Sequence, residues 1–405
     1  MSEQQEIKKA LVRRLLPLYI AGFFQGFVLW YNVEKLFMHS IGFDNTAIGF
    51  MVAIYSFVML AVNSPSGILA DRWSRKGVLV LASISLMLSC IVGGLSHGIT
   101  AYLLCAILWG IFYACYSGVY DTIIYDVVTE AEAPNKMFEY LYGRLQVVDS
   151  AALVAAGLLG GLIANEVSLR ATYFISAPMG LFAIWALLRF REPMLHRKHG
   201  VMTVTQQVRA SFRAALRNRS LLPVILVLIL EATLIYSMYE FAQLWLLALH
   251  LRTVYFGVAN AVLLLSLGVG GYSVDKLKVN RFYLAAATLL LLIATCIGLI
   301  ISRNIVIVVL AQFVFASCLV NIYVIFSRIL HDNLSPATRA GASSAASTLG
   351  RLFIIPIALL IGYLSQKYSI YSAAYVLLVL VVLMAAIVMV VANRNNKKGL
   401  EPTIE

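Results

Sequence analysis

Long apolar stretches separated by short polar ones repeat along the whole chain of 405 residues. An α-helix of about 20 apolar residues spans the hydrocarbon core of a bilayer, and twelve of the stretches approach that length. They cover residues 15–38, 46–70, 78–96, 101–125, 144–165, 172–190, 221–249, 254–272, 282–302, 305–329, 342–365 and 371–392. The pattern predicts an all-α polytopic membrane protein with twelve transmembrane helices.

One polar stretch is much longer than the others and divides the chain. Residues 191–220 hold seven basic residues, and we expect them to link two six-helix bundles at residues 1–190 and 221–405. An apolar stripe and a basic stripe each recur every four residues in this linker: Val204, Val208, Phe212, Leu216, and Arg209, Arg213, Arg217. They predict a basic amphipathic helix, which either lies on the inner leaflet or serves as an exposed connection.

The composition agrees with a membrane protein. Hydrophobic residues make up 61% of the chain and charged residues 12%, with a mean hydropathy of +0.87. A soluble domain is about 45–50% apolar and about 25% charged. These values exclude an ordinary water-soluble enzyme.

Topology explains the formal net charge of +12. If both termini face the cytoplasm, 25 of the 31 Lys and Arg residues fall on inside segments and five outside, with Arg351 within a helix. This asymmetry follows the positive-inside rule, so the charge does not require a nucleic-acid partner. We expect a multi-pass protein of the bacterial cytoplasmic (inner) membrane, surrounded by lipids, with both termini in the cytoplasm.

A short motif occurs at equivalent places in the two halves. GILADRWSRK at residues 67–76 and GYSVDKLK at residues 271–278 both contain G-x-x-x-D followed by a basic residue, 204 residues apart. The tripeptide Gly-Arg-Leu also occurs twice, at residues 143–145 and 350–352, 207 residues apart. Two nearly equal offsets indicate repeated halves, an arrangement typical of secondary transporters.

Residues 67–76 resemble the signature G-x-L-A-D-R-x-G-R-K of the major facilitator superfamily, with Ser74 in place of the second glycine. The resemblance covers essentially the whole chain and implies two pseudo-symmetric six-helix bundles that alternate access to a central cavity. It also implies a conformational latch at the two repeated loops, made by Gly67, Asp71, Arg72, Arg75, Lys76, Gly271, Asp275 and Lys276.

The resemblance also implies roles for Gly67 and Asp126, and it extends to a glycine-rich segment. Gly67 would let two helices approach closely, and Asp126 would meet Arg75 or Arg144 at the same end of the bundle. Alternatively, the loop charges only keep the loop from crossing the membrane.

The segment AGLLGG at residues 156–161 is similar to the G-P-x-x-G-G of drug/proton antiporters but lacks its proline and first glycine. Tight helix packing would select the same small residues.

Ionisable groups inside a membrane are costly, so each one is a functional candidate. Glu231 lies ten residues after Leu221, which is about 15 Å into the bilayer at about 1.5 Å per residue. This depth suits reversible protonation, while an ion pair with Arg351 is the structural alternative. Glu240 is nine residues further along. It therefore lies half a revolution away from Glu231, and the two acids cannot face one cavity unless the helix is broken.

An aromatic stripe in the fourth helix is a second candidate. Tyr113, Tyr116, Tyr120 and Asp121 share one face of a regular helix at about 100° per residue. Such a face suits a substrate cavity, with Asp121 at its inner end, but ordinary helix packing explains it equally well.

Isolated polar residues in other helices complete the candidates. Gln25 and Asn32 are seven residues apart and would share a face of the first helix. The remaining polar candidates are Asp149 and Asn321.

Glu34 and Lys35 lie near the outer end of the first predicted helix. Because neighbouring residues cannot share a helix face, we expect their charges to extend separately to the outer surface.

These residues indicate secondary active transport of a small organic solute, with the proton as coupling ion and no other cofactor. Export of amphipathic or cationic compounds is the preferred interpretation. Proton symport or facilitated uptake of a nutrient is the alternative, and a membrane-embedded enzyme or lipid-handling protein is a remote one. No G-x-x-x-x-G-K-[ST] motif is present for ATP. We expect no enzyme and no metal site, and we expect the chain to function as a monomer.

Overall fold

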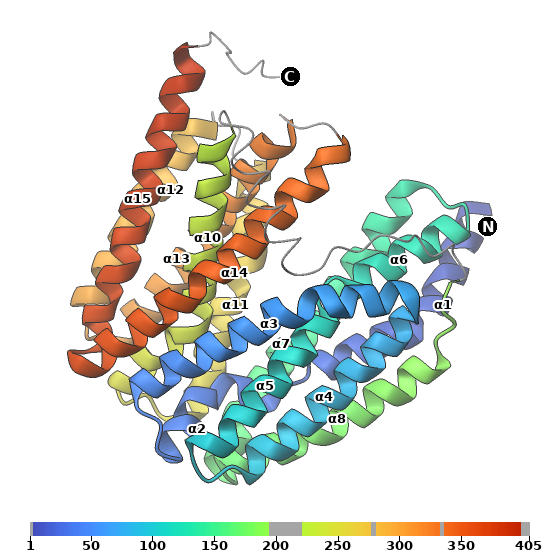
Figure 1. Cartoon of the computed structure of the whole chain (residues 1–405), viewed down its shortest axis with the longest axis horizontal. Coiled ribbons are helices and arrows are strands. Elements are labelled where there is room, and N and C mark those ends of the chain that lie inside the picture. The colour runs from blue at the N-terminus through green and yellow to red at the C-terminus, as the bar shows by residue number, and fades with distance from the viewer. Residues whose placement is uncertain (1–2, 194–220, 277–280, 333–335, 398–405) are drawn as a thin grey trace. The chain divides into compact units, whose positions relative to one another are not determined.

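The part of the chain that the structure describes folds entirely into helices (Figure 1). A computed structural model describes residues 3–193, 221–276, 281–332 and 336–397. The helices before the linker are α1 (Glu3–Gly26), η1 (Leu29–Val33), α2 (Glu34–Ser40), α3 (Asn45–Arg72), α4 (Arg75–Leu95), α5 (Ile99–Tyr116), α6 (Val119–Glu130), α7 (Asn135–Glu166) and α8 (Leu169–Arg189). Those after it are α10 (Leu222–Ala248), η2 (Thr253–Tyr255), α11 (Phe256–Lys276), α12 (Arg281–Ile301), α13 (Ile305–Asp332), α14 (Pro336–Lys367) and α15 (Ile370–Lys397).

The helices confirm the prediction of an all-α polytopic membrane protein. Eleven segments of the described chain are long and apolar enough to cross a membrane. The predicted span at residues 254–272 corresponds to a shorter apolar stretch, Thr253–Leu267, within the described part. The amphipathic helix expected around Val204 and Arg209 lies outside the described residues.

The first predicted span is not one continuous helix. Helix α1 ends at Gly26, and the chain continues through the short helix η1 into α2. Val28, between them, has an extended backbone with φ −109° and ψ 98°. The prediction of one helix over residues 15–38 is therefore wrong, because apolar composition does not reveal a change of backbone direction.

The fourth predicted span, residues 101–125, is also interrupted. Helix α5 ends at Tyr116 and α6 begins at Val119. Gly118 between them has φ +79°, a left-handed conformation that glycine adopts without a Cβ clash. The tyrosines predicted to share one regular helix are thus divided between two helices.

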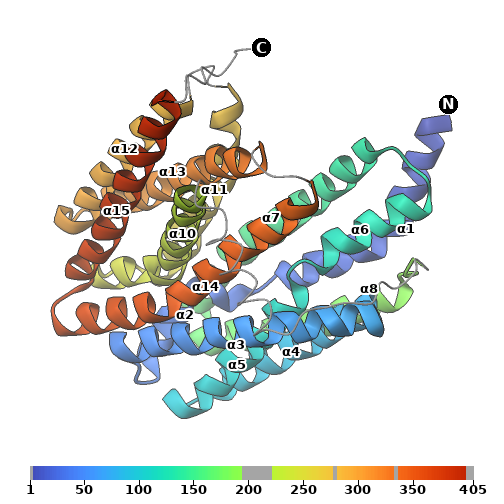
Figure 2. The same ribbon diagram turned by 45° about the horizontal axis from the view of Figure 1, so that its top comes forward.

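The contacts divide the chain into two compact units. Unit 1 consists of Met1–Phe43, Phe57–Val204 and Arg252–Ala261, and unit 2 of Asp44–Ser56, Thr205–Leu251 and Val262–Glu405. The start of α3 therefore groups with the second half of the chain, and η2 with the start of α11 groups with the first. In unit 1, α4 packs along α5 and α8, as Figures 1 and 2 show.

The glycine-rich segment of α7 packs tightly within unit 1. A Cβ on Gly160 would overlap the Leu29 carbonyl, and one on Gly161 would lie 2.8 Å from the carbonyl oxygen of Val254. A side chain at these places would push η1 and η2 away from α7. This packing explains the glycines of residues 156–161.

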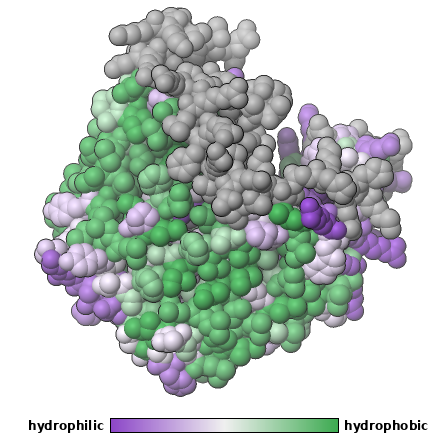
Figure 3. All heavy atoms as spheres, viewed as in Figure 1, coloured by the Kyte–Doolittle hydropathy of each residue, from purple (hydrophilic) through white to green (hydrophobic). Residues whose placement is uncertain are grey.

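Apolar side chains point outward as well as inward. The exposed fraction is 67% for Leu188 in unit 1 and 69% for Leu290 in unit 2. Figure 3 shows broad apolar areas on the face that it presents. A soluble protein rarely exposes such areas, whereas lipid chains cover them at no cost.

Candidate functional site

A buried hydrogen-bond network surrounds Gln25 at the end of α1. The Gln25 side chain is 1% exposed. Its Nε2 donates to Ser83 Oγ at 2.8 Å and to the Leu79 carbonyl at 3.2 Å, both on α4. The hydroxyl of Tyr120 on α6 donates to Gln25 Oε1. Gln25 therefore connects three helices of unit 1.

Asp149 on α7 lies beside this network and is only partly hydrogen-bonded. The Tyr116 hydroxyl donates to Asp149 Oδ2 at 2.9 Å. Oδ1 is buried and accepts no hydrogen bond in the described part of the chain. A Cβ on Gly22 would lie 3.1 Å from Oδ1, so α1 passes close to the carboxyl group. We call Gln25, Tyr116, Tyr120 and Asp149 the polar cluster of unit 1.

The rings of the two tyrosines in the polar cluster, and that of Tyr113, lie next to one another. The ring centroids of Tyr116 and Tyr120 are 5.1 Å apart, and those of Tyr113 and Tyr116 are 6.3 Å apart. The rings of Tyr116 and Tyr120 are thus neighbours, although the break at Gly118 places the two residues on different helices. Asp121 is half-buried in the first turn of α6.

Asn32 does not share a helix face with Gln25, because the first span is broken between them. Asn32 is 2% exposed and accepts a hydrogen bond from Asn260 Nδ2. Asn260, on α11 within unit 1, was not predicted as a candidate. The signal that could have identified it is the same one that identified Asn32, a polar residue inside an apolar stretch.

Glu231 is a buried acid in α10 of unit 2. Its side chain is 5% exposed, and it makes no hydrogen bond or ion pair with any residue that the structure describes. The alternative of an ion pair with Arg351 is thus not formed, and the Arg351 guanidinium lies 5.8 Å from the centroid of the Tyr236 ring. Arg351 and Asn321 are both half-buried.

Glu240 lies on a different face of the same helix. Helix α10 runs without a break from Leu222 to Ala248, so the nine residues from Glu231 to Glu240 amount to half a revolution. Glu240 is half-buried. The two acids therefore point in opposite directions from α10.

The prediction that Glu34 and Lys35 extend separately to the surface is wrong. Their side chains are 6% and 1% exposed, and Lys35 Nζ lies 2.6 Å from Glu34 Oε2. The Tyr102 hydroxyl donates to Glu34 Oε1 at 3.0 Å and lies 2.7 Å from the Tyr173 hydroxyl. Because α2 begins at Glu34, directly after η1, the two side chains are not bound by the geometry of a long regular helix.

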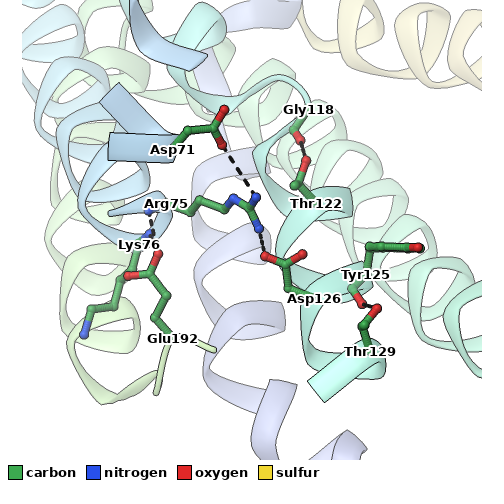
Figure 4. Close-up of polar contacts among 9 residues, drawn as sticks. All are labelled: Asp71, Arg75, Lys76, Gly118, Thr122, Tyr125, Asp126, Thr129 and Glu192. Atoms are coloured by element: carbon green, nitrogen blue, oxygen red, sulfur yellow. Dashed lines mark hydrogen bonds and ion pairs between the residues drawn. The ribbon is translucent and has the colours of Figure 1, made fainter. Parts of the chain in front are cut away.

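Arg75 at the start of α4 joins three helices (Figure 4). Its guanidinium forms an ion pair with Asp126 on α6 and lies 3.5 Å from Asp71 on α3. The contact with Asp126 was one of the two predicted for that residue. A Cβ on Gly67 would meet no atom within 4 Å in the described structure, so the close helix approach at Gly67 stays a prediction. Arg72 is exposed.

The second copy of the loop is only partly described. Gly271, Asp275 and Lys276 lie in the last turns of α11, and their side-chain surroundings are outside the described residues.

The structure offers no metal-binding group in its described part. It contains no cluster of three or more His, Cys, Asp or Glu side chains there. The five cysteines are free and buried: Cys90, Cys105, Cys115, Cys296 and Cys318.

Several known proteins are similar to this chain in sequence. Multidrug resistance protein 1 of Bacillus subtilis (strain 168) is 28% identical over 180 residues, covering 44% of each chain. Quinolone resistance protein NorA of Staphylococcus aureus (strain MSSA476) is 21% identical over 235 residues, covering 56% of this chain and 58% of that protein. The chain thus matches about half the length of these relatives.

Solved structures share the fold over nearly the whole chain. A bacterial homologue of the human lysosomal transporter Spinster has a TM-score of 0.75 at 16% identity and covers 98% of both chains. The nucleoside transporter NupG has a TM-score of 0.72 at 16% identity and covers 94% of this chain and 98% of that one.

A family profile also matches most of the chain. Residues 15–355 match the profile described as Major Facilitator Superfamily, which agrees with the twelve-span pattern and the shared fold. Members of this superfamily are secondary transporters rather than enzymes. This chain belongs to the Major Facilitator Superfamily.

Proposed function

We propose that this transporter is coupled to protons and exports small amphipathic or cationic organic compounds. The observation that carries the proposal is Glu231, an acid buried in a membrane-spanning helix with no cationic partner in the described structure. An unpaired ionised carboxylate in an apolar bundle is strongly unfavourable. A bound proton or a cationic substrate removes this cost, so Glu231 suits either role.

Asp149 supplies a second acid, in unit 1. Its Oδ2 accepts from Tyr116, while Oδ1 is buried without a donor in the described chain. Little free space surrounds Oδ1 on the side of α1, because a Cβ on Gly22 would already lie 3.1 Å away. A proton adds almost no volume, so protonation of Asp149 removes its buried negative charge without moving α1. The tyrosine rings beside Asp149 also suit a flat or cationic solute.

The relatives support export over uptake. The two similar proteins described above are named for resistance to multiple drugs and to quinolones. Because the matches cover about half of each protein, they support a class of substrate and not a particular compound. Proton-coupled uptake of a nutrient is the alternative to be tested.

The charge asymmetry supports an orientation with both termini in the cytoplasm. The relatives are bacterial, which supports the bacterial cytoplasmic membrane as the location. One copy of the chain contains both acids, so we propose that a monomer transports.

Transport by purified protein in liposomes tests the proposal. Ethidium, a flat organic cation, should accumulate inside liposomes whose interior is more acidic than the bath, because outward proton flow drives its entry. The protonophore-treated sample is the control and should not accumulate ethidium. Accumulation that is unaffected by the protonophore would contradict proton coupling.

A thermal-shift screen identifies the solute class in parallel. Ligands that bind only the folded carrier raise its unfolding temperature. Stabilisation by amines and dyes supports export. Stabilisation only by sugars, amino acids or carboxylates, with counterflow of that solute in liposomes, would contradict the export proposal and favour nutrient uptake. Turnover of a lipid without any gradient would contradict both.

A further inference from the structure

The first turn of α4 is held by a residue outside the signature motif. Glu192 lies three residues after Arg189, the last residue of α8. Its Oε1 accepts from the backbone N–H of Arg75 at 2.6 Å and of Lys76 at 3.4 Å. Its Oε2 accepts from the Ser74 hydroxyl at 2.5 Å. Figure 4 shows Glu192 against this turn.

Ser74 completes the arrangement as the N-cap of α4. Its Oγ accepts from the Gly77 N–H at 2.8 Å while it donates to Glu192. The first N–H groups of a helix have no partner within the helix, and here Glu192 and Ser74 together supply acceptors. The signature motif has glycine at the place of Ser74, and glycine has no hydroxyl to donate. The serine that replaces the signature glycine therefore makes the hydrogen bond to Glu192 possible.

Arg75 is held from two directions. Its backbone N–H binds Glu192, and its guanidinium binds Asp126 and Asp71. The Lys76 ammonium also donates to the Phe190 carbonyl at 3.2 Å, which fixes the end of α8 to the same turn. The carboxylate of Glu192 lies at the positive end of the α4 dipole, where a negative charge is stabilising. The backbone position from which Arg75 reaches Asp126 therefore depends on Glu192.

We propose that Glu192 is a positioning residue for the Arg75–Asp126 ion pair and thereby biases the conformational equilibrium of the transporter. Contacts at the α3–α4 turn and at α6 stabilise one arrangement of unit 1 at this end. Loss of Glu192 lets the turn relax, so the ion pair weakens and the equilibrium shifts. A helix cap alone would stabilise α4 without affecting the ion pair.

Spin-label distances test the proposal without a substrate. Nitroxides at Thr129→Cys on α6 and Tyr323→Cys on α13 report the distribution of distances between unit 1 and unit 2. The native cysteines are buried, so introduced ones label first. The proposal is independent of ethidium transport, and failure of the export proposal leaves this measurement interpretable.

The expected result is a shift of populations in Glu192→Gln, which removes the charge but keeps the shape. The ratio of the two populations should change roughly three- to tenfold. Asp126→Asn should shift it in the same direction, and Glu192→Gln should add nothing in the Asp126→Asn background. The control is Glu166→Gln, an exposed glutamate at the end of α7 that contacts its neighbour Asn165; it should leave the distribution unchanged.

Two results would overturn the proposal. One is an unchanged distribution in a folded Glu192→Gln protein. The other is an undiminished effect of Glu192→Gln in the Asp126→Asn background, which indicates a cap independent of the ion pair. If Glu192→Gln does not fold, Ser74→Gly removes the hydroxyl donor while glycine remains acceptable at the N-cap. Ser74→Gly should then produce the same shift as Asp126→Asn, and no shift would count against the proposal.

Discussion

At the scale of single residues, buried charges in this transporter fall into two kinds. Glu34 has a neutralising partner in Lys35 and a hydrogen bond from Tyr102. Glu231 has no such partner among the described residues. A paired buried charge stabilises the fold only while its partner is present, whereas an unpaired one can bind and release a proton. The first kind is structural and the second is suited to transport.

The Glu34–Lys35 pair leads to a stability prediction. Lys35→Met should lower the free energy of unfolding by about 3–5 kcal/mol, because it leaves the Glu34 carboxylate buried without its counter-charge. The double variant Glu34→Gln with Lys35→Met should recover much of that loss. Thermal unfolding of the purified variants in detergent measures both. Equal unfolding temperatures for wild type and Lys35→Met would show that the pair is not needed.

Residue types in apolar stretches identified most members of the buried network. A glutamine, an aspartate and tyrosines stand out there because polar groups must find partners away from lipid. The partners themselves were not predictable, since Ser83 and Asn260 meet Gln25 and Asn32 only after folding. The burial of Lys35 could not be predicted either, because hydropathy does not reveal that the first span is interrupted before Glu34.

At the scale of elements, interruptions of the helices and close contacts between them determine where these residues lie. The interruptions between α1 and α2 and between α5 and α6 lie inside apolar stretches. Hydropathy does not reveal them, because the residues on both sides are apolar. Gly118, with φ +79°, is the one residue there whose type allows the turn between α5 and α6. The glycine segment of α7 was open to two interpretations from sequence, and its contacts with η1 and η2 establish the packing role.

The close approach at Gly160 can be tested with a matched glycine. Gly160→Ala should destabilise the protein by about 1–3 kcal/mol, because the added Cβ overlaps the Leu29 carbonyl. Gly143→Ala on the same helix has open space around its Cβ, and it should be neutral or stabilising because alanine favours helices. Thermal unfolding compares the two. Similar unfolding temperatures for both variants would argue against the tight packing.

The ion pairs of Arg75 lead to a ranking of transport defects. Asp126 contacts Arg75 with a side chain that is 16% exposed, whereas Asp71 is 37% exposed and 3.5 Å away. Asp126→Asn should therefore slow ethidium transport more than Asp71→Asn, with ethidium affinity retained in both. Asp275→Asn should do least, because its loop lacks the full basic pattern. Wild-type rates in all three would reduce the loop to a topology signal.

At the scale of the whole molecule, hydropathy and the internal repeat predicted the fold. Twelve apolar stretches and two nearly equal offsets led to an all-α transporter of two repeated halves, and the family match agrees. Sequence order did not predict that residues 44–56 group with unit 2 and residues 252–261 with unit 1. Such an exchange depends on tertiary contacts that a linear pattern does not contain.

The proposed orientation can be checked by labelling. Cysteines introduced at Ser2 and Ile404 should react with an impermeant thiol reagent only after the cells are opened. An even number of spans places both termini on the same side, and the Lys and Arg asymmetry places that side in the cytoplasm. A cysteine at His97, in the polar loop between α4 and α5, should react in intact cells. Reaction of either terminus in intact cells would contradict the orientation.

The central claim is that Glu231 carries the coupling proton, and gradient-driven ethidium accumulation by Glu231→Gln in liposomes tests it most directly. Glutamine resembles a permanently protonated glutamate, so the variant should still exchange ethidium one-for-one but lose accumulation driven by a pH gradient. Glu166→Gln, in the exposed end of α7, should accumulate ethidium as wild type does. Wild-type accumulation by a folded Glu231→Gln protein would contradict the claim.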